Sequence, residues 1–326
     1  MRKKLLGITA ALTFAIGLAG CGSSSDTGSA TTEAVVEKAE AETEASEEAS
    51  EEAVPETEAQ EDVDVLTSTK GDSSEAINFT YTGDPVTIKV GASITPHAEI
   101  LREAQPILAE QGITLEIVEL EDYVTPNTGV IEGSLDANYF QHTPYLNQFN
   151  EENGSDIVSI GAVHYEPFGV YAGKTASLDE LQDGASVAVP NDVTNEARAL
   201  LLLQQEGILK LKDDAGINAT IADIVDNPKN IQFKELAPEQ LVQALPDVDV
   251  AVINGNYAVE GGLSVKDALA VEANDGLAAQ TYGNIVATSS KNADNEALKA
   301  LVSVLQGSKI AEYINSTYNG AVVPLY

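Results

Sequence analysis

One short stretch of the chain brings together aromatic and polar side chains that could enclose a small solute. In residues 138–145 (NYFQHTPY), His142 stands among three aromatic residues, where a short apolar segment gives way to a predicted helix. Only 5% of the chain is aromatic, so this local concentration favours a flat apolar wall with polar tips. The alternative is that Phe140 and Tyr145 are ordinary core and that His142 is a satisfied hydrogen-bonding group.

Arg198 is the second candidate, because it follows a predicted strand, 186–190 (SVAVP), and a polar loop. We expect it in the first turn of a helix that contains Leu200. The free N–H groups and positive dipole end of such a helix favour a carboxylate, to which an arginine adds a charge-assisted contact. A cation in the first turn opposes the helix dipole, and an anionic ligand would remove that conflict. The alternative is a solvated arginine paired with Glu196 or Asp192.

A third polar group follows the apolar segment 248–254, which we predict to be a buried strand. Residues 254–257 (NGNY) place two amides and a phenol at its carboxyl end. Asn254 offers both donors and an acceptor, which suits a zwitterion. Asn-Gly is also a common turn dipeptide, so the segment could equally mark a turn.

Signatures of enzymes and metal sites are missing from the sequence. There is no nucleophile elbow, Walker loop or dinucleotide-binding glycine motif. The three histidines, His97, His142 and His164, lack the spacing of a helical zinc motif, so a metal site would require the fold to bring them together. We expect a binding protein rather than an enzyme, with no catalytic residue, no cofactor and no metal.

From about residue 85 onward, short apolar runs alternate with helix-length amphipathic segments, which indicates an α/β fold. The region opens with a strand, a helix and a strand, over residues 86–92, 96–111 and 113–120. We predict one solute-binding domain, 85–326, made of two lobes that face each other across a ligand cleft. The predicted lobes comprise about 85–170 with 285–326, and about 171–284.

The N-terminus has the pattern of a targeting segment. A basic start precedes the apolar run 5–18, which is short for a bilayer span and typical of a signal peptide. The following Leu-Ala-Gly-Cys resembles the lipobox of bacterial lipoproteins, which implies that residues 1–20 are removed and that Cys21 carries lipid. The alternative is a chance cysteine near an ordinary cleavage site. We expect a protein anchored to the cell membrane through lipid, on its extracytoplasmic side.

The chain has 52 acidic and 17 basic side chains and a net charge of −35, which makes nucleic acid an unsuitable partner. Much of the acidity lies in a segment rich in Glu, Ala, Ser and Thr that cannot bury enough apolar surface to fold. We therefore predict that residues 21–84 are a lipidated cysteine followed by an acidic disordered linker.

Several longer motifs are more specific. They are 121–127 (EDYVTPN), 136–142 (DANYFQH), 177–184 (SLDELQDG), 187–192 (VAVPND), 227–230 (NPKN) and 251–254 (AVIN). In this order they resemble the methionine-binding lipoproteins, the solute receptors of ABC-type methionine importers. The resemblance implies a two-lobed, periplasmic-binding-protein-like fold, with hinge strands and a central cleft that closes on the ligand.

The resemblance also implies a ligand and the residues that bind it. Methionine or a closely related amino acid would be delivered to an ABC permease and its ATPase, and we expect a monomeric receptor. The thioether would lie among four residues, and four others would hold the polar end: Tyr123, Phe140, His142 and Tyr145, and then Arg198 for the carboxylate with Asn195, Asn254 and Asn284.

Three alternatives remain open from the sequence. Val193 stands where many relatives have proline, and this departure puts the fine ligand preference in question. The ligand could then be another small amino acid or a dipeptide. A surface-anchored enzyme with His142 as general base, or an adhesin with a vestigial cleft, are the readings from other functional classes.

Overall fold

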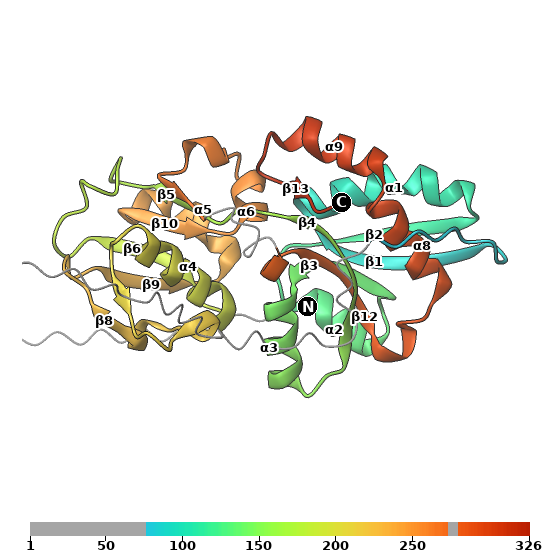
Figure 1. Ribbon diagram of the computed structural model, residues 1–326, viewed down its shortest axis with the longest axis horizontal. Coiled ribbons are helices and arrows are strands. Elements are labelled where there is room, and N and C mark those ends of the chain that lie inside the picture. The colour runs from blue at the N-terminus through green and yellow to red at the C-terminus, as the bar shows by residue number, and fades with distance from the viewer. Residues whose placement is uncertain (1–75, 273–279) are drawn as a thin grey trace, which may run out of the picture. The chain divides into compact units, whose positions relative to one another are not determined.

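The computed structural model describes residues 76–272 and 280–326, which form an α/β fold with two large sheets and a separate two-stranded pair (Figure 1). The predicted signal peptide, Cys21 and most of the predicted linker lie outside the described residues. Within the described ranges, no helix is long and apolar enough to cross a bilayer.

The first lobe is built on a six-stranded sheet with the order β13-β4-β12-β3-β1-β2. β1 pairs in parallel with β2 and β3, whereas β12 runs antiparallel to β3 and β4. The strands are β1 (Val86–Ser93), β2 (Ile113–Leu120), β3 (Ala137–His142), β4 (Ile157–Tyr165), β12 (Asn284–Ser289) and β13 (Val323–Pro324). The helical elements are η1 (Ile94–Ala98), α1 (Glu99–Glu110), α2 (Thr125–Glu132), α3 (Thr143–Asn153), α8 (Glu296–Leu305) and α9 (Ser308–Tyr318).

Both faces of this sheet are covered by helices, and β12 shows how the sequence achieves this. Successive strand side chains point to opposite faces. Val286 accordingly belongs to the core formed with α1, α8 and α9, whereas Ile285 and Ala287 pack with residues of α2 and α3. A strand buried on both faces needs apolar residues at consecutive positions, which explains why Ile285, Val286 and Ala287 follow one another in β12.

The second lobe is built on a five-stranded sheet with the order β11-β5-β10-β6-β9. β6 pairs in parallel with β9 and β10, and β5 runs antiparallel to β10 and β11. The strands are β5 (Gly169–Ala172), β6 (Ser186–Pro190), β9 (Gln232–Leu236), β10 (Val250–Ile253) and β11 (Ala270–Val271), with a small pair β7 (Lys210–Leu211) and β8 (Ile224–Asp226). The helices are α4 (Val193–Gln205), α5 (Leu241–Ala244) and α6 (Gly255–Glu260), and short 3-10 turns occupy Gly216–Asn218, Ile221–Asp223, Pro238–Gln240, Leu245–Asp247, Val265–Asp267 and, in the first lobe, Ser290–Asn292.

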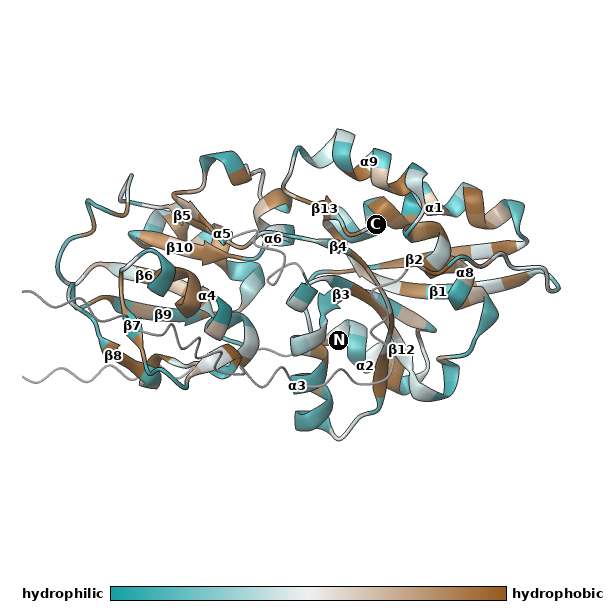
Figure 2. Ribbon diagram, viewed as in Figure 1, coloured by the Kyte–Doolittle hydropathy of each residue, from teal (hydrophilic) through white to brown (hydrophobic). Residues whose placement is uncertain are grey.

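The same alternation of side chains along a strand determines which residues form the core of the second lobe. Val187 and Val189 of β6 pack with the leucines of α4, while Ala188 between them packs with residues of α5 and α6. Figure 2 shows the pattern for both lobes, since the strands and the helix sides that face them are hydrophobic and the outer sides hydrophilic.

The chain crosses between the two sheets twice, from β4 to β5 through residues 166–168 and back between β11 and β12. The α/β prediction with two lobes is confirmed by this arrangement. The chain already packs at Ile77 and Phe79, whose N–H groups donate to Gln306 Oε1 (2.6 Å) and Ser303 Oγ (2.9 Å). The predicted boundary at residue 85 therefore falls after the point where packing begins.

Candidate functional site

A small pocket collects the polar groups at the strand ends of both lobes. The structure brings all of the residues that we predicted to bind ligand to its wall: Tyr123, Phe140, His142, Tyr145, Asn195, Arg198, Asn254 and Asn284. The prediction missed four further lining residues, Gln141, Glu166, Gly255 and Asn256.

Aromatic rings form one wall of the pocket. The Tyr123 ring centroid lies 5.7 Å from that of Phe140 and 5.8 Å from that of Tyr145, and the Tyr145 hydroxyl donates to the Tyr123 carbonyl at 3.0 Å. Phe140 is also buried in a core cluster, so it serves both packing and the pocket wall. Tilted and edge-on ring contacts of this kind hold the wall in one geometry.

His142 ends β3 and caps the N-terminus of α3. Its Nδ1 accepts the Tyr145 N–H at 3.2 Å, so in the neutral ring the proton is on Nε2, which donates to Asn195 Oδ1 at 3.1 Å. Burial, and then the charge of Arg198, lower the pKa of His142 to about 4, which keeps the ring neutral at neutral pH. Both ring nitrogens are therefore engaged.

The N-terminus of α4 is occupied by the chain's own carboxylate. Asp192 Oδ1 accepts the Asn195 N–H at 3.0 Å and the Asn195 side-chain amide at 2.9 Å. The sequence favours an anionic ligand at these N–H groups, but the Asp192 carboxylate already accepts the Asn195 N–H and itself places a negative charge at the helix end. Because α4 begins at Val193, Arg198 lies in the second turn rather than in the first.

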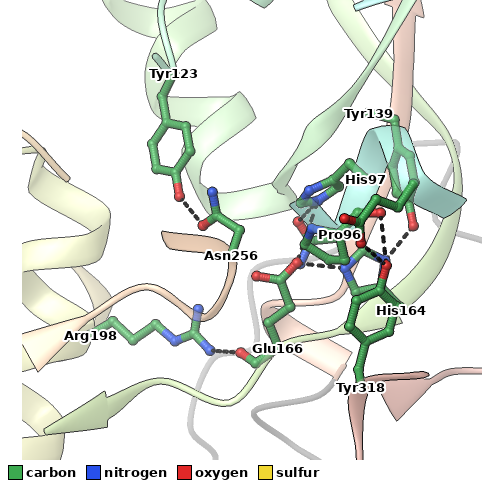
Figure 3. A network of polar contacts seen from close by, with 11 residues as sticks. Pro96, His97, Tyr123, Tyr139, His164, Glu166, Arg198, Asn256 and Tyr318 are labelled. Carbon is green, nitrogen blue, oxygen red and sulfur yellow. Dashed lines mark hydrogen bonds and ion pairs between the residues drawn. The ribbon is translucent and has the colours of Figure 1, made fainter. Parts of the chain in front are cut away.

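Arg198 is buried and forms a bidentate ion pair with Glu272. Its Nε lies 2.9 Å from Glu272 Oε1, and its Nη2 lies 2.6 Å from Oε2. Nη2 also donates to the Glu166 carbonyl at 2.9 Å, the contact that Figure 3 shows. The guanidinium carbon lies 4.2 Å from the ring centroid of Tyr282 and 4.8 Å from that of Phe168. Nη1 donates to none of the described residues. The guanidinium is thus held on three sides and offers one donor edge.

This pairing differs from the solvated arginine that we considered. The alternative partners were Glu196 and Asp192, but Glu196 Oε1 accepts the Ile221 N–H at 3.0 Å and Asp192 caps α4. The ion pair with Glu272 joins residues that are distant in sequence, and no local pattern points to it.

Two asparagines at the junction of β10 and α6 hold polar atoms that lack a partner. Asn254 donates from Nδ2 to Asn195 Oδ1 at 3.0 Å, and Asn256 Oδ1 accepts the Tyr123 hydroxyl at 2.5 Å. Among the described residues, Asn254 Oδ1 and Asn256 Nδ2 are buried without a hydrogen bond. Such atoms are costly in a folded protein, and both residues line the pocket, so a bound molecule could satisfy them.

Glu166 closes the pocket from the segment between the lobes, where it belongs to a buried polar network (Figure 3). Its Oε1 accepts His164 Nε2 at 2.7 Å and lies 3.6 Å from His97 Nε2, which contacts Asn284 Oδ1 at 2.9 Å. The Tyr139 hydroxyl contacts His164 Nδ1. The register of the strands brings these side chains together, because Asn284 of β12 pairs with His164 on one side and with the strand of Tyr139 on the other.

His97, His164 and Glu166 are the described residues with metal-ligand potential, since their ligand atoms lie within 4.8 Å of one another. Hydrogen bonds engage Nε2 of both histidines, whereas His97 Nδ1 is buried without a hydrogen bond to any described residue. Asn284 Oδ1 and a Glu166 oxygen can only accept, and so each Nε2 carries a proton that a metal would have to displace. Burial lowers the pKa of His97 to about 4 and that of His164 to about 3, which favours these neutral rings.

Comparison with known proteins identifies the relatives of the chain. The family model described as NlpA lipoprotein matches residues 88–326. The chain is 42% identical over 243 residues to the methionine-binding lipoprotein MetQ of Bacillus subtilis, covering 73% of this chain and 88% of that protein.

Two solved structures show the same fold. A nutrient-binding protein from Burkholderia cenocepacia bound to methionine has a TM-score of 0.70 at 42% identity, covering 73% of this chain and 100% of that one. A periplasmic substrate-binding protein of an ABC transporter from Coxiella burnetii has a TM-score of 0.69 at 39% identity, covering 73% and 99%. These structures confirm the predicted two-lobed, solute-binding fold class.

Proposed function

The chain belongs to the NlpA lipoprotein family, and from this we propose that it is a solute-binding protein that captures methionine, or a closely related amino acid, for an ABC importer. The relatives support the ligand class, because one is named a methionine-binding lipoprotein and another has methionine bound. The Coxiella burnetii relative supports the partnership with an ABC permease and its ATPase.

The single observation that carries the proposal is the complementarity between the unpartnered atoms of the pocket and a zwitterion. Asn254 Oδ1 is a buried acceptor without a donor, and Glu166 adds a carboxylate, so an ammonium group would suit both. Asn256 Nδ2 is a buried donor without an acceptor among the described residues, and the guanidinium of Arg198 also lines the pocket. Both groups suit a carboxylate. An α-amino acid has both groups on one carbon.

The aromatic wall provides for the side chain of the ligand. Burying a methionine side chain contributes roughly 1.5–3 kcal/mol, and contacts of the sulfur with ring edges about 0.3–1.5 kcal/mol more. A charge-assisted hydrogen bond to the carboxylate contributes about 1.5–3 kcal/mol. Since the two contributions are similar in size, the affinity depends on the polar end of the ligand as well as on its side chain.

Direct contacts between the lobes support a mechanism of closure. His142 reaches Asn195 across the pocket, Tyr123 reaches Asn256, and the Tyr257 hydroxyl donates to the Glu121 carbonyl at 2.8 Å. A ligand that fills the unpartnered positions between these contacts would stabilise the closed arrangement, which the permease would recognise.

The geometry favours binding over catalysis. A general base needs a free lone pair, but His142 Nδ1 accepts a backbone N–H and Nε2 carries the proton that it donates to Asn195. His142 is therefore unsuited to act as the general base of the enzyme alternative. The named relatives are binding proteins as well.

We propose that Cys21, which lies outside the described residues, carries the lipid that anchors the receptor on the extracytoplasmic side of the cell membrane. The relatives described as lipoproteins support this assignment. Metabolic labelling with a fatty acid should mark the parent protein in the membrane fraction. A Cys21→Ala variant that still acquires label would disprove the assignment.

The ligand can be tested on freshly purified protein. Mass spectrometry of the denatured material should release methionine if the receptor retains its ligand. Calorimetry on protein stripped of ligand should then give heat with methionine and none with glutamate, whose second carboxylate would meet the aromatic wall. Absence of heat with both enantiomers of methionine would overturn the proposal, and heat with a dipeptide or another amino acid would redirect it.

A further inference from the structure

Arg198, in the wall of the pocket, forms an ion pair with Glu272 of the same chain. Glu272 follows β11, and its backbone N–H donates to the Phe168 carbonyl at 2.9 Å, which fixes the residue beside the segment between the lobes. Its carboxylate accepts Arg198 Nε and Nη2, and Oε2 also accepts the Tyr165 hydroxyl at 2.5 Å. The side chains of Arg198 and Glu272 are only 5% and 12% exposed.

The geometry of the pair limits what Arg198 can offer a ligand. A guanidinium binds a carboxylate most strongly through two parallel N–H groups. Glu272 takes Nε and one N–H of Nη2, and the Glu166 carbonyl takes the other N–H of Nη2. Nη1 remains as the donor toward the pocket. The carboxylate of a ligand can therefore gain a single contact from Arg198 and cannot form the fork.

The Glu272 carboxylate also compensates the positive charge of Arg198. In the buried pair the guanidinium and the Glu272 carboxylate together carry no net charge. His142 is a neutral ring, and Glu166 is the remaining ionisable carboxyl group among the described lining residues. The electrostatic environment thus favours the ammonium end of a zwitterion more than its carboxylate end.

We propose that Glu272 is a specificity-determining residue: a built-in counter-ion of Arg198 that makes the receptor select its ligand by ammonium group and side chain, and tolerate a neutral amide in place of the carboxylate. The inference rests on the proposed function and deepens it. It predicts a ligand range that includes amino acid amides, and amino acids whose carboxyl group is already part of a peptide bond.

The test compares two ligands of equal shape, methionine and methionine amide, by calorimetry on protein stripped of ligand, at a pH where both amino groups carry a proton. For the parent protein we expect dissociation constants within about tenfold of each other, since one neutral contact replaces one charge-assisted contact. Discrimination against the amide by more than about a hundredfold would overturn the inference.

The matched variant is Glu272→Gln, which keeps the acceptor oxygen and the side-chain size and removes the charge. Arg198 then carries an uncompensated positive charge. The affinity for methionine should therefore rise, and the affinity for the cationic amide should fall. We expect the ratio of the two dissociation constants to shift toward methionine by about fivefold or more. An unchanged ratio, or an equal loss for both ligands, would show a merely structural role and overturn the inference.

The control removes the same charge from a comparable pair outside the pocket. Glu119 pairs with Arg102 on the surface of the first lobe, where the two side chains are 42% and 46% exposed. Glu119→Gln should leave the ratio unchanged, and a shift there would remove the assignment to Glu272. If Glu272→Gln does not fold, the ratio of the two dissociation constants measured on the parent protein decides the test by itself. A parent protein that binds neither ligand contradicts the proposed function, whereas one that binds only methionine contradicts the role of Glu272.

Discussion

His142 Nε2 lies 3.1 Å from Asn195 Oδ1, and this hydrogen bond joins the end of β3 in the first lobe to the first turn of α4 in the second. The helix cap depends on a neutral histidine, because Nδ1 accepts the Tyr145 N–H at the start of α3 and can do so only while it carries no proton. One residue thus caps a helix, lines the pocket and holds the lobes together.

The contact between the lobes can be separated from the helix cap by His142→Asn. Asparagine is a good N-cap residue and can still accept the Tyr145 N–H, but it is too short to reach Asn195. Loss of one neutral hydrogen bond costs about 0.5–1.5 kcal/mol, so ligand affinity should fall roughly two- to tenfold. Calorimetry measures the affinity and thermal unfolding checks the cap. Unchanged affinity would show that the contact does not contribute to closure.

The sequence predicts the site where its residues follow local rules. β3 ends in a polar residue, and polar residues directly follow β6 and β10; strand ends in open α/β sheets converge on a common cleft. For that reason the segments of His142, Arg198 and Asn254 could be placed in one site before the fold was known. Gln141, Gly255 and Asn256 lie in the same segments, but nothing in the pattern distinguishes them from their neighbours.

The parts of the site that the sequence did not predict depend on tertiary contacts. Glu272 meets Arg198 because β11 lies beside β5 in the second sheet, and strand order is not encoded in the spacing of residues. His97 and His164 meet because β1, β3, β12 and β4 are neighbours in the first sheet, although they are far apart in the chain. Such pairs have no periodic or motif-like signal.

The buried histidines predict how stability depends on pH. Burial lowers the pKa of His97 and His142 to about 4 and that of His164 to about 3, whereas an unfolded chain binds these protons near 6.5. Below pH 6.5 the unfolded state therefore binds more protons, and stability falls as the pH falls toward 4. Each histidine contributes at most about 1.4 kcal/mol per pH unit. Burial raises the pKa of Glu166, which offsets part of the loss.

Urea unfolding at several pH values between about 7 and about 5 would measure this slope, because the proton linkage is the derivative of the unfolding free energy. His142→Asn should reduce the slope by the share of one histidine and serves as the internal comparison. A free energy of unfolding that stays constant over this range would contradict the assignment of neutral, buried histidines.

Glu166 predicts how binding depends on pH. Burial raises the pKa of its carboxyl group above the ordinary 4.5, although His97 and Arg198 act in the opposite direction. An ammonium ligand needs the ionised carboxylate, so affinity should fall as the pH falls, beginning above pH 4.5. Glu166→Gln should bind more weakly at neutral pH, by roughly tenfold for one charge-assisted contact.

The control for this prediction is Glu116→Gln, at an exposed position of β2. It should keep the affinity of the parent protein and its dependence on pH, while Glu166→Gln should lose that dependence. A titration of affinity against pH that is the same in the parent and in Glu166→Gln would rule out Glu166 as the ammonium partner.

At Gly255 the backbone of the second lobe approaches Glu166 so closely that a side chain at this position would collide with it. A Cβ atom at this position would lie 2.6 Å from Glu166 Cβ and 3.0 Å from Glu166 Oε2, so an added methyl group would push the carboxylate out of the pocket. Gly255→Ala should therefore weaken ligand binding as well as lower the stability, the latter by about 1–3 kcal/mol as is typical of overpacking.

Gly161 provides a matched control, because a Cβ there would lie 2.4 Å from Val302 Cγ1 in the first core, away from the pocket. Gly161→Ala should lower the unfolding temperature by a similar amount and leave the affinity for the ligand at the parental value. Comparing the two variants by thermal unfolding and by calorimetry separates general destabilisation from damage to the site. Equal losses of affinity in both would mean that the position of Glu166 does not control binding.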